Sequence, residues 1–422
     1  MIPGTPAKSP NVANHLGLPM AEVLVQVCWQ RFPGLRYPFP TMPSDSMDDI
    51  ELKNIQLQFP VSRCLGRDPA SPVCEERVHT DRGELLVAVH GSRNKPAILT
   101  YHDLGLNYIS SYQAFFNFVD MRALLENFCV FHVNAPGQEE GAPAFPEDYI
   151  YPTMDELANQ LNFVLGHFGI KSFIGFGVGA GANILARFGL AHPEKVDALC
   201  LINCVSTQAG WIEWGYQKLN ARHLRSKGMT QGVLDYLMWH HFGRGTEERN
   251  HDLVHVYKSY FTRHVNPTNL ALLIDSYVRR SDLNIVRGEL GTDNLKRAAT
   301  STTLRMPIIN ITGSLSPHVD DTVTLNGRLD PTNSTWMKIS DCGMVLEEQP
   351  GKVSEAFRLF LQGEGYVQIS SVRFPIRVIC SILDIVAPLS PSKIHVVRSQ
   401  SCAEHSPVIH ITENPISEAV AC

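Results

Sequence analysis

The stretch GFGVGAGA, residues Gly175–Ala182, consists mostly of small residues between an apolar run and a helical segment. Catalytic and ligand-binding turns have such a pattern. A strand, a tight turn of small residues and a helix form either a turn that exposes a nucleophile or a loop that cradles a pyrophosphate. In the first case the spacing places the nucleophile at Gly177, which has no side chain and cannot attack an electrophile.

The second case is a dinucleotide loop, since GFGVGA fits the pattern G-x-G-x-x-A. That pattern is weak alone, and it should follow the first strand of its unit, with an acidic residue at the end of the next strand. Here the run follows about the fifth apparent strand, and the next strand ends in LINC, without a carboxylate. The context therefore disfavours the dinucleotide interpretation.

The acid and the base of an acyl-transfer site are also missing where they are expected. The acid should follow the next-to-last strand, where GSLSPHVDD places Ser316. Asp320 and Asp321 are displaced alternatives, but solvated loop carboxylates are the commoner state. The histidine should follow the last strand, where DCGMV places Met344. With Gly177, Ser316 and Met344 in the three roles, the sequence predicts a protein without side-chain acyl-transfer chemistry and not an enzyme.

Strands and helices alternate along residues 83–204, and residues 207–303 have helical character. Strands resume at residues 306–313 and 334–343, and a last helix covers residues 351–363. This order predicts an α/β-hydrolase fold, with a mostly parallel eight-stranded sheet, helices on both faces and a helical cap insertion. The predicted parts are a flexible N-terminal extension (1–46), a first core part (47–206), the cap (207–303), a second core part (304–363) and a flexible tail (364–422).

Part of the site architecture persists in YHDLG, which ends the third core strand, where hydrolases place an oxyanion amide. His102 and Asp103, together with Gly177 and Val178, are therefore the predicted pocket residues. The alternative is that His102 and Asp103 are a satisfied loop pair that stabilises the turn.

Composition excludes several function classes. The net charge is −6 over 422 residues and no long basic run is present, which argues against nucleic acid as a partner. The ten cysteines are scattered, and reduced, mostly buried thiols are expected. No signal peptide or membrane-spanning run is visible, so we expect a cytoplasmic protein with at most peripheral membrane association. No motif implies a cofactor.

Four histidines fall in the cap, and one pair has the i, i+4 spacing of a shared helix face; they are His240, His241, His251 and His255. A zinc site would also require a carboxylate and supporting hydrogen bonds, so surface or capping histidines are the preferred interpretation and no metal is predicted.

The tail holds two features of interest. PIRVICSILDIV, residues 375–386, has one polar stripe at helical spacing, and docking of its apolar face on the body of the protein is the default expectation. RSQS contains Ser399 and Ser401, which are possible phosphorylation sites because Arg398 precedes Ser401 by three residues.

Several long blocks resemble the N-myc downstream-regulated (NDRG) family of α/β-hydrolase-like proteins, in an invertebrate-type form, over residues 47–362. The blocks are MDDIELKNIQLQFP, LTYHDLGLNYISSYQAFFNF, HVNAPGQEEGA, GFGVGAGANILARFGLAHPEKVDALCLIN and YFTRHVNPTNLALLIDSYVRRSDLNIVR. The resemblance implies a non-catalytic cytosolic protein linked to growth control, differentiation, stress response and vesicle traffic. The family's tails are often serine-rich and phosphorylated. Residues 1–46 lie outside the resemblance and could be an isoform-specific start.

Three hypotheses follow. The first is a pseudo-hydrolase that acts as a signalling or adaptor protein through protein partners. The second is a receptor that keeps the pocket and binds a small molecule or lipid without chemistry. The third is a residual hydrolase with a displaced site that uses Ser316, His318 or Cys204.

Overall fold

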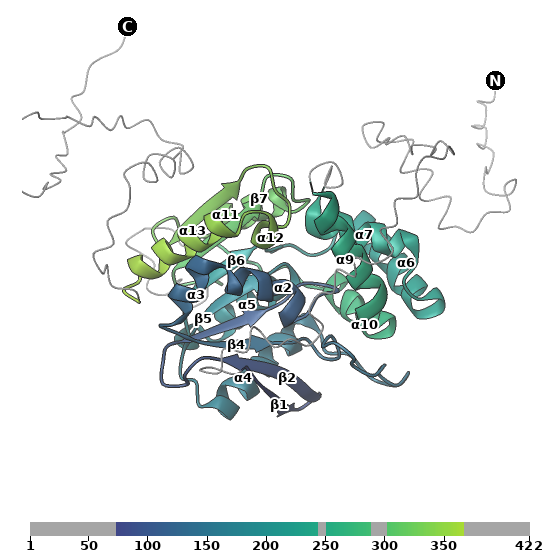
Figure 1. Ribbon diagram of the computed structural model, residues 1–422, viewed down its shortest axis with the longest axis horizontal. Coiled ribbons are helices and arrows are strands. Elements are labelled where there is room, and N and C mark those ends of the chain that lie inside the picture. The colour runs from purple at the N-terminus through teal and green to yellow at the C-terminus, as the bar shows by residue number, and fades with distance from the viewer. Residues whose placement is uncertain (1–72, 244–249, 288–301, 367–422) are drawn as a thin grey trace, which may run out of the picture. The chain divides into compact units, whose positions relative to one another are not determined.

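A mixed sheet of eight strands lies at the centre of the protein, in the order β1-β2-β4-β3-β5-β6-β7-β8 (Figure 1). The computed structural model describes residues 73–243, 250–287 and 302–366. All strands from β4 to β8 in this order run parallel, and β2 pairs antiparallel with both β1 and β4. The strands are β1 (Cys74–Thr80), β2 (Gly83–His90), β3 (Ala97–Tyr101), β4 (Cys129–Val133), β5 (Phe173–Val178), β6 (Val196–Ile202), β7 (Ile308–Gly313) and β8 (Ser334–Ile339). The predicted mostly parallel eight-stranded sheet is confirmed.

Strand β1 was not predicted from the sequence. Its residues, CEERVHT, are mostly polar, and only Val78 is fully buried. It lies at the edge of the sheet, so one side of its backbone pairs with β2 and its side chains give little apolar alternation. The beginning of the predicted first core part, residues 47–72, lies outside the described residues.

Helices cover both faces of the sheet (Figure 1). One face packs against α2, α3 and α13, and the other packs against α4, α5 and α11. The helices of the core are α2 (Tyr108–Asn117), α3 (Val119–Leu125), α4 (Met154–Phe168), α5 (Ala180–Ala191), α11 (Val319–Arg328), α12 (Val345–Glu348) and α13 (Pro350–Gly363), with a short 3₁₀ turn at Pro193–Lys195.

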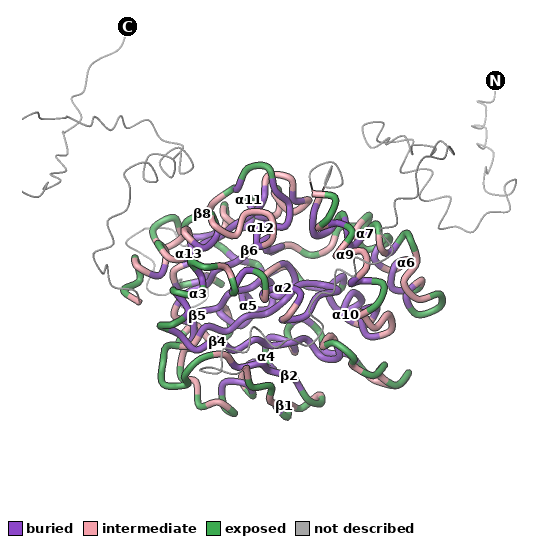
Figure 2. The backbone as a smooth tube through the Cα atoms, viewed as in Figure 1, coloured by how far each residue is buried: buried purple, intermediate pink, exposed green. Residues whose placement is uncertain are grey.

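The two faces follow from the alternation of side chains along each strand. In β3, Ile98 joins the apolar cluster under α2 and α13, whereas its neighbour Leu99 joins the cluster under α4 and α5. Both side chains are fully buried, because a parallel sheet between two helix layers leaves neither face in water. Figure 2 shows the resulting buried centre, in which the central strands are purple over most of their length.

The helical run FFNFVDMRALLENF, residues 115–128, is divided between two helices. Helix α2 begins at Tyr108, and α3 ends at Leu125. Between them Phe118 adopts φ −59° and ψ 139°, which is extended backbone and interrupts the helical hydrogen bonds. The side chain of Phe118 packs against the apolar cluster of that face, so burial compensates for the break.

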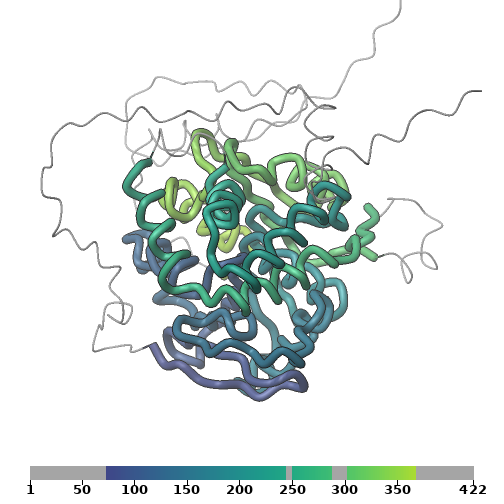
Figure 3. Tube along the Cα trace, turned by 90° about the vertical axis from the view of Figure 1, so that its right-hand side faces the viewer, coloured from purple at the N-terminus to yellow at the C-terminus, as the bar shows by residue number. Residues whose placement is uncertain are grey.

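The cap consists of four described helices between β6 and β7, at the position predicted for the insertion. They are α6 (Trp211–Lys227), α7 (Gln231–Phe242), α9 (His251–His264) and α10 (Pro267–Val278). Figure 3, which turns this side toward the viewer, shows the teal and green cap helices in front of the core. Hydrogen bonds fasten the cap to the core; for example, the hydroxyl of Tyr257 on α9 donates to the carbonyl of Ser110 on α2 at 2.9 Å.

Asn269 on α10 also connects the cap to the core by hydrogen bonds, and its side chain is fully buried. Its amide nitrogen donates to the carbonyls of Gly137 and Pro143, and its oxygen accepts from the amide of Phe145, each at 2.9 Å. We expect Asn269→Ala to lower the free energy of unfolding by about 2 kcal/mol, because buried backbone groups lose their partners.

Urea denaturation would measure this effect. Asn127→Ala is the matched control, because the exposed Asn127 side chain makes a hydrogen bond of 3.3 Å to the nearby Leu124 carbonyl, and its loss should cost well under 1 kcal/mol. Equal losses in the two variants would contradict the fastening role of Asn269.

Candidate functional site

The turn between β5 and α5 has the geometry of a nucleophile position, and glycine occupies it. Gly179 has φ 53° and ψ −114°, and its amide donates to the carbonyl of Ile202 at 2.8 Å. The spacing in the sequence predicts the vacant position at Gly177, but Gly177 lies inside β5, paired with Tyr101 and Leu201. The turn is therefore two residues later, and the small-residue window is GVGAG, residues 177–181.

The carboxylate of Asp103 fills the space beside this turn. A side chain built on Gly179 would collide with that carboxylate. Asp103 Oδ1 accepts hydrogen bonds from the amides of Leu104 at 2.8 Å and Ala180 at 2.9 Å. In an α/β-hydrolase, the amide after the nucleophile and an amide after the third strand bind the oxyanion. Asp103 thus presents its own oxygen to the two amides that would stabilise a reaction intermediate.

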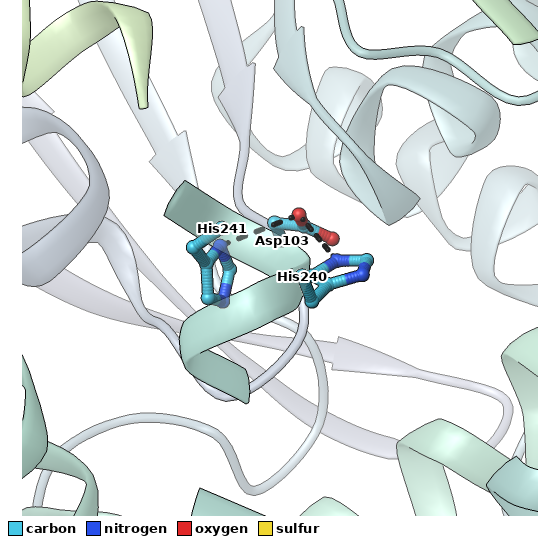
Figure 4. A group of neighbouring side chains, drawn as sticks. All are labelled: Asp103, His240 and His241. Atoms are coloured by element: carbon cyan, nitrogen blue, oxygen red, sulfur yellow. Dashed lines mark hydrogen bonds and ion pairs between the residues drawn. The ribbon is translucent and has the colours of Figure 1, made fainter. Parts of the chain in front are cut away.

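Two cap histidines approach the other oxygen of the same carboxylate (Figure 4). Asp103 Oδ2 lies 2.9 Å from His240 Nε2 and 3.7 Å from His241 Nδ1, both on α7. Both rings are buried, so the expectation that His240 and His241 are surface or capping residues is wrong for these two. His251 and His255 are exposed on α9, as expected.

A third histidine extends the network away from the carboxylate. His318 Nε2 lies 3.2 Å from His240 Nδ1, and His318 Nδ1 lies 3.4 Å from Asp321 Oδ2. Both residues follow β7, in the segment where a hydrolase carries its acid. Asp321 is not the solvated loop residue that was expected from the sequence; it is half-buried at the start of α11 and contacts a histidine of this network. This loop contacts the network through His318, whereas the Ser316 hydroxyl accepts the backbone amide of His318 at 3.2 Å.

The protonation states follow from burial and these contacts. Burial alone would raise the pKa of the Asp103 carboxyl, but His240, His241 and the Ala180 amide on balance lower it below its usual value. Burial lowers the pKa of His241 to about 4, and the nearby His240 ring also opposes its protonation. Burial also lowers the pKa of His318, against the opposing effect of Asp321. Near neutral pH, Asp103 is a carboxylate and His241 is a neutral imidazole.

His102 has a different role from its neighbour. Its Nε2 accepts the amide of Ala135 at 2.9 Å, so its Nδ1 carries the proton and donates to the Asp103 carbonyl at 2.8 Å. Burial lowers the pKa of His102 to about 4, which favours this neutral form. For His102, the satisfied-loop alternative describes the structure, since both nitrogens hold the turn that carries Asp103.

A small pocket adjoins the carboxylate. Of the four predicted pocket residues, Asp103 and Val178 line it, whereas His102 and Gly177 do not. Met344, the residue at the expected base position, lines the same pocket with mostly apolar neighbours. The other lining residues are Leu106, Ser111, Ile202, Asn203, His241, Val345 and Leu346.

The groups proposed for a displaced hydrolase are poorly arranged for attack. Burial raises the pKa of the Cys204 thiol to about 12, although nearby arginines oppose this, so the thiolate is scarce near neutral pH. His318 directs its nitrogens to His240 and Asp321, and the Ser316 hydroxyl accepts a backbone amide. Ser316, His318 and Cys204 therefore do not place a nucleophile beside a general base.

Some sequence features fall outside the described residues, among them the tail segment 375–386 and the candidate phosphorylation sites Ser399 and Ser401. The boundary at 46/47 and most of the tail fall there too. In the described segments, no helix combines the length and apolar character needed to cross a membrane.

Comparison with known proteins gives the same fold and a family. The model of the Ndr family matches residues 75–368. Protein NDRG3 of Xenopus laevis is 39% identical over 330 residues, which cover 76% of this chain and 85% of that protein. Protein NDRG2 of Homo sapiens is 40% identical over 296 residues, which cover 69% of this chain and 75% of that protein.

Among solved structures, a thermophilic esterase from Thermogutta terrifontis has a TM-score of 0.55 and 16% identity, and the match covers 69% of this chain and 98% of the esterase. An enol-lactonase from Burkholderia xenovorans LB400 has a TM-score of 0.53 and 15% identity, over 68% of this chain and 100% of the lactonase.

The order of the strands, the tight turn between β5 and α5 and the helical cap together define a protein of the α/β-hydrolase fold. Within that class, the family is shown by the length of the matched region and by the sequence identity to the relatives. The chain belongs to the Ndr family, as the sequence blocks predicted.

Proposed function

We propose that this chain is a non-catalytic α/β-hydrolase-like protein that acts in the cytoplasm as a signalling or adaptor protein. The observation that carries the proposal is the Asp103 carboxylate, which occupies both oxyanion amides beside a glycine at the nucleophile position. A substrate carbonyl would have to displace a buried, hydrogen-bonded charge to reach those amides. Growth control, differentiation, stress response and vesicle traffic are the processes that family membership suggests.

Exposed aromatic side chains on the cap support action through partners. On α6, Trp211 is 88% exposed, and Trp214 and Tyr216 are also exposed. Large apolar side chains that gather on a surface are typical of interaction sites. We therefore propose that partners bind the exposed surface of the cap and not the turn beside Asp103.

The test is labelling with a fluorophosphonate and turnover of short aryl esters. We expect neither from the native protein, and none from Gly179→Ser, because its new side chain would collide with the Asp103 carboxylate. Gly177→Ser serves as a comparison inside β5, where a side chain would collide with the backbone of Ala182.

Turnover by the native protein that survives further purification would contradict the proposal. Loss of that turnover in Ser316→Ala or Cys204→Ala would show a relocated hydrolase site, which is the third hypothesis.

The second candidate is a small-molecule or lipid receptor, and the apolar pocket that Met344 and Leu346 line favours it. A saturable ligand should raise the midpoint of thermal unfolding, and Leu346→Ala should weaken that rise. An uncharged apolar ligand suits this pocket best, because the Asp103 carboxylate at its wall repels anions.

A further inference from the structure

We propose that Asp103, His240 and His241 form a binding site for Zn²⁺ that joins the core to the cap. One carboxylate oxygen and two imidazole nitrogens lie within 4.8 Å of one another, and all three side chains are buried. Two histidines and one carboxylate are a common ligand set for zinc. This inference concerns metal binding and is independent of the proposed adaptor function.

The distances are close to those of a zinc site. Ligand atoms around tetrahedral zinc lie about 3.3 Å apart, given metal–ligand bonds of about 2.0–2.2 Å. The oxygen Oδ2 of Asp103 lies 2.9 Å from His240 Nε2 and 3.7 Å from His241 Nδ1, on either side of that value. Figure 4 shows both rings turned toward the carboxylate from one turn of α7. The third distance, between the two histidine nitrogens, is no more than 4.8 Å.

The tautomer of His241 provides an independent argument. Its Nε2 lies 2.9 Å from the carbonyl oxygen of Leu104, and a carbonyl only accepts, so Nε2 carries the proton. Nδ1 is therefore the nitrogen of His241 that can bind a metal, and it lies 3.7 Å from Oδ2 of Asp103. A hydrogen bond from the other ring nitrogen to a backbone carbonyl is the usual support of a metal-binding histidine.

The surrounding hydrogen bonds fit the metal-bound form. With zinc on Nε2 of His240, its Nδ1–H donates to His318 Nε2, and His318 Nδ1–H donates to Asp321. Each ring nitrogen in this chain then has a partner.

Hydrogen bonds also fix the Asp103 carboxylate in an orientation suited to a metal ligand. Its Oδ1 accepts the amides of Leu104 and Ala180, which fixes the orientation of the free oxygen Oδ2. Such second-layer hydrogen bonds orient metal ligands and strengthen binding. Asp103 and His241 also line the small pocket described above.

The experiment uses the full chain, stripped with a chelator and then titrated with Zn²⁺ or Co²⁺ alone. We expect one equivalent to bind and to raise the midpoint of thermal unfolding, because a ligand that binds the folded state stabilises it. The Co²⁺ spectrum should show nitrogen and oxygen ligands without a thiolate charge-transfer band. Failure of the stripped protein to bind one equivalent would overturn the proposal.

Two variants remove one ligand each and keep the local hydrogen bonds. Asp103→Asn retains an oxygen for the two amides, and His241→Gln retains an N–H for the Leu104 carbonyl. Each should weaken zinc binding by at least about tenfold. The control His255→Gln removes an exposed histidine from α9 and should bind zinc as the native chain does.

Unchanged affinity in both ligand variants would overturn the proposal, as would an equal loss in His255→Gln. If the variants do not fold, X-ray absorption spectroscopy of the zinc-loaded native protein identifies the atoms that bind the metal. Two imidazoles with one or more oxygens support the site, and sulfur ligands contradict it.

Discussion

Replacement of Gly181 by alanine is expected to lower the free energy of unfolding by about 4 kcal/mol. A Cβ at this position would collide with the carbonyl of Tyr101 and would lie 2.6 Å from the carbonyl oxygen of His102. Both obstacles are backbone, so no rotation of a flexible side chain can relieve them. Helix α5 must move away from the end of β3, which also disturbs the amide of Ala180 that binds Asp103.

The competing effect is helix propensity, which favours alanine over glycine by about 1 kcal/mol and is too small to reverse the sign. Gly166→Ala is the matched control, because Gly166 is exposed in α4 and a Cβ there meets nothing within 4 Å. It should raise the free energy of unfolding by about 0.5–1 kcal/mol. Urea denaturation measures both, and a stable Gly181→Ala would show that α5 does not rest on the β3 backbone.

Acidification is expected to destabilise the protein through His132, which lies fully buried in β4. Its ring stacks with Tyr108 and Tyr112, and its Nδ1 lies 2.8 Å from the hydroxyl of Thr100. Burial, with a smaller effect of nearby His90, lowers the pKa of His132 to about 3. Protonation of this ring in the folded state would leave a charge in an apolar layer.

The sign follows from the two pKa values. The unfolded chain takes up a proton near pH 6.5 and the folded chain only near pH 3, so the stabilisation is complete above about pH 6.5 and is lost as the pH falls toward 3. Between pH 7.5 and pH 4, His132 alone should account for about 3 kcal/mol of lost stability.

Urea denaturation across this pH range measures the loss. In His132→Phe the dependence of stability on pH should be weaker by about this amount, whatever its effect at neutral pH. His251→Gln, at an exposed position of α9, should leave the pH dependence unchanged. If His132→Phe retains the full dependence of the native protein, the ring is protonated equally in both states.

Much of the fold could be predicted from the sequence, because buried strands and capped helices leave local signals. The segment at residues 153–169 is an example. Thr153 Oγ1 accepts the amide of Glu156 at 3.2 Å, Glu156 Oε2 accepts the amide of Thr153 at 2.8 Å, and Gly169 ends the helix with φ 68°. Strand β1 lacks such a signal, since an edge strand with one fully buried side chain resembles a loop.

The site was harder to predict than the fold. Glycine occurs at both Gly177 and Gly179, so spacing alone did not show which one forms the turn; the backbone angles distinguish them. Asp103 was recognised as a pocket residue because it follows a core strand. The approach of His240 and His241 was missed, since 137 positions along the chain separate Asp103 from His240 and only the packing of α7 on the core brings them together.

The attachment of Asp103 to the turn has a consequence for every external anion. Oδ1 belongs to the same loop as the Leu104 amide that it accepts, so its effective concentration at the two amides is that of an intramolecular group. A free carboxylate or phosphate must also lose translational and rotational freedom on binding, which the tethered carboxylate of Asp103 does not. External anions therefore compete at a disadvantage for the two amides that Asp103 occupies.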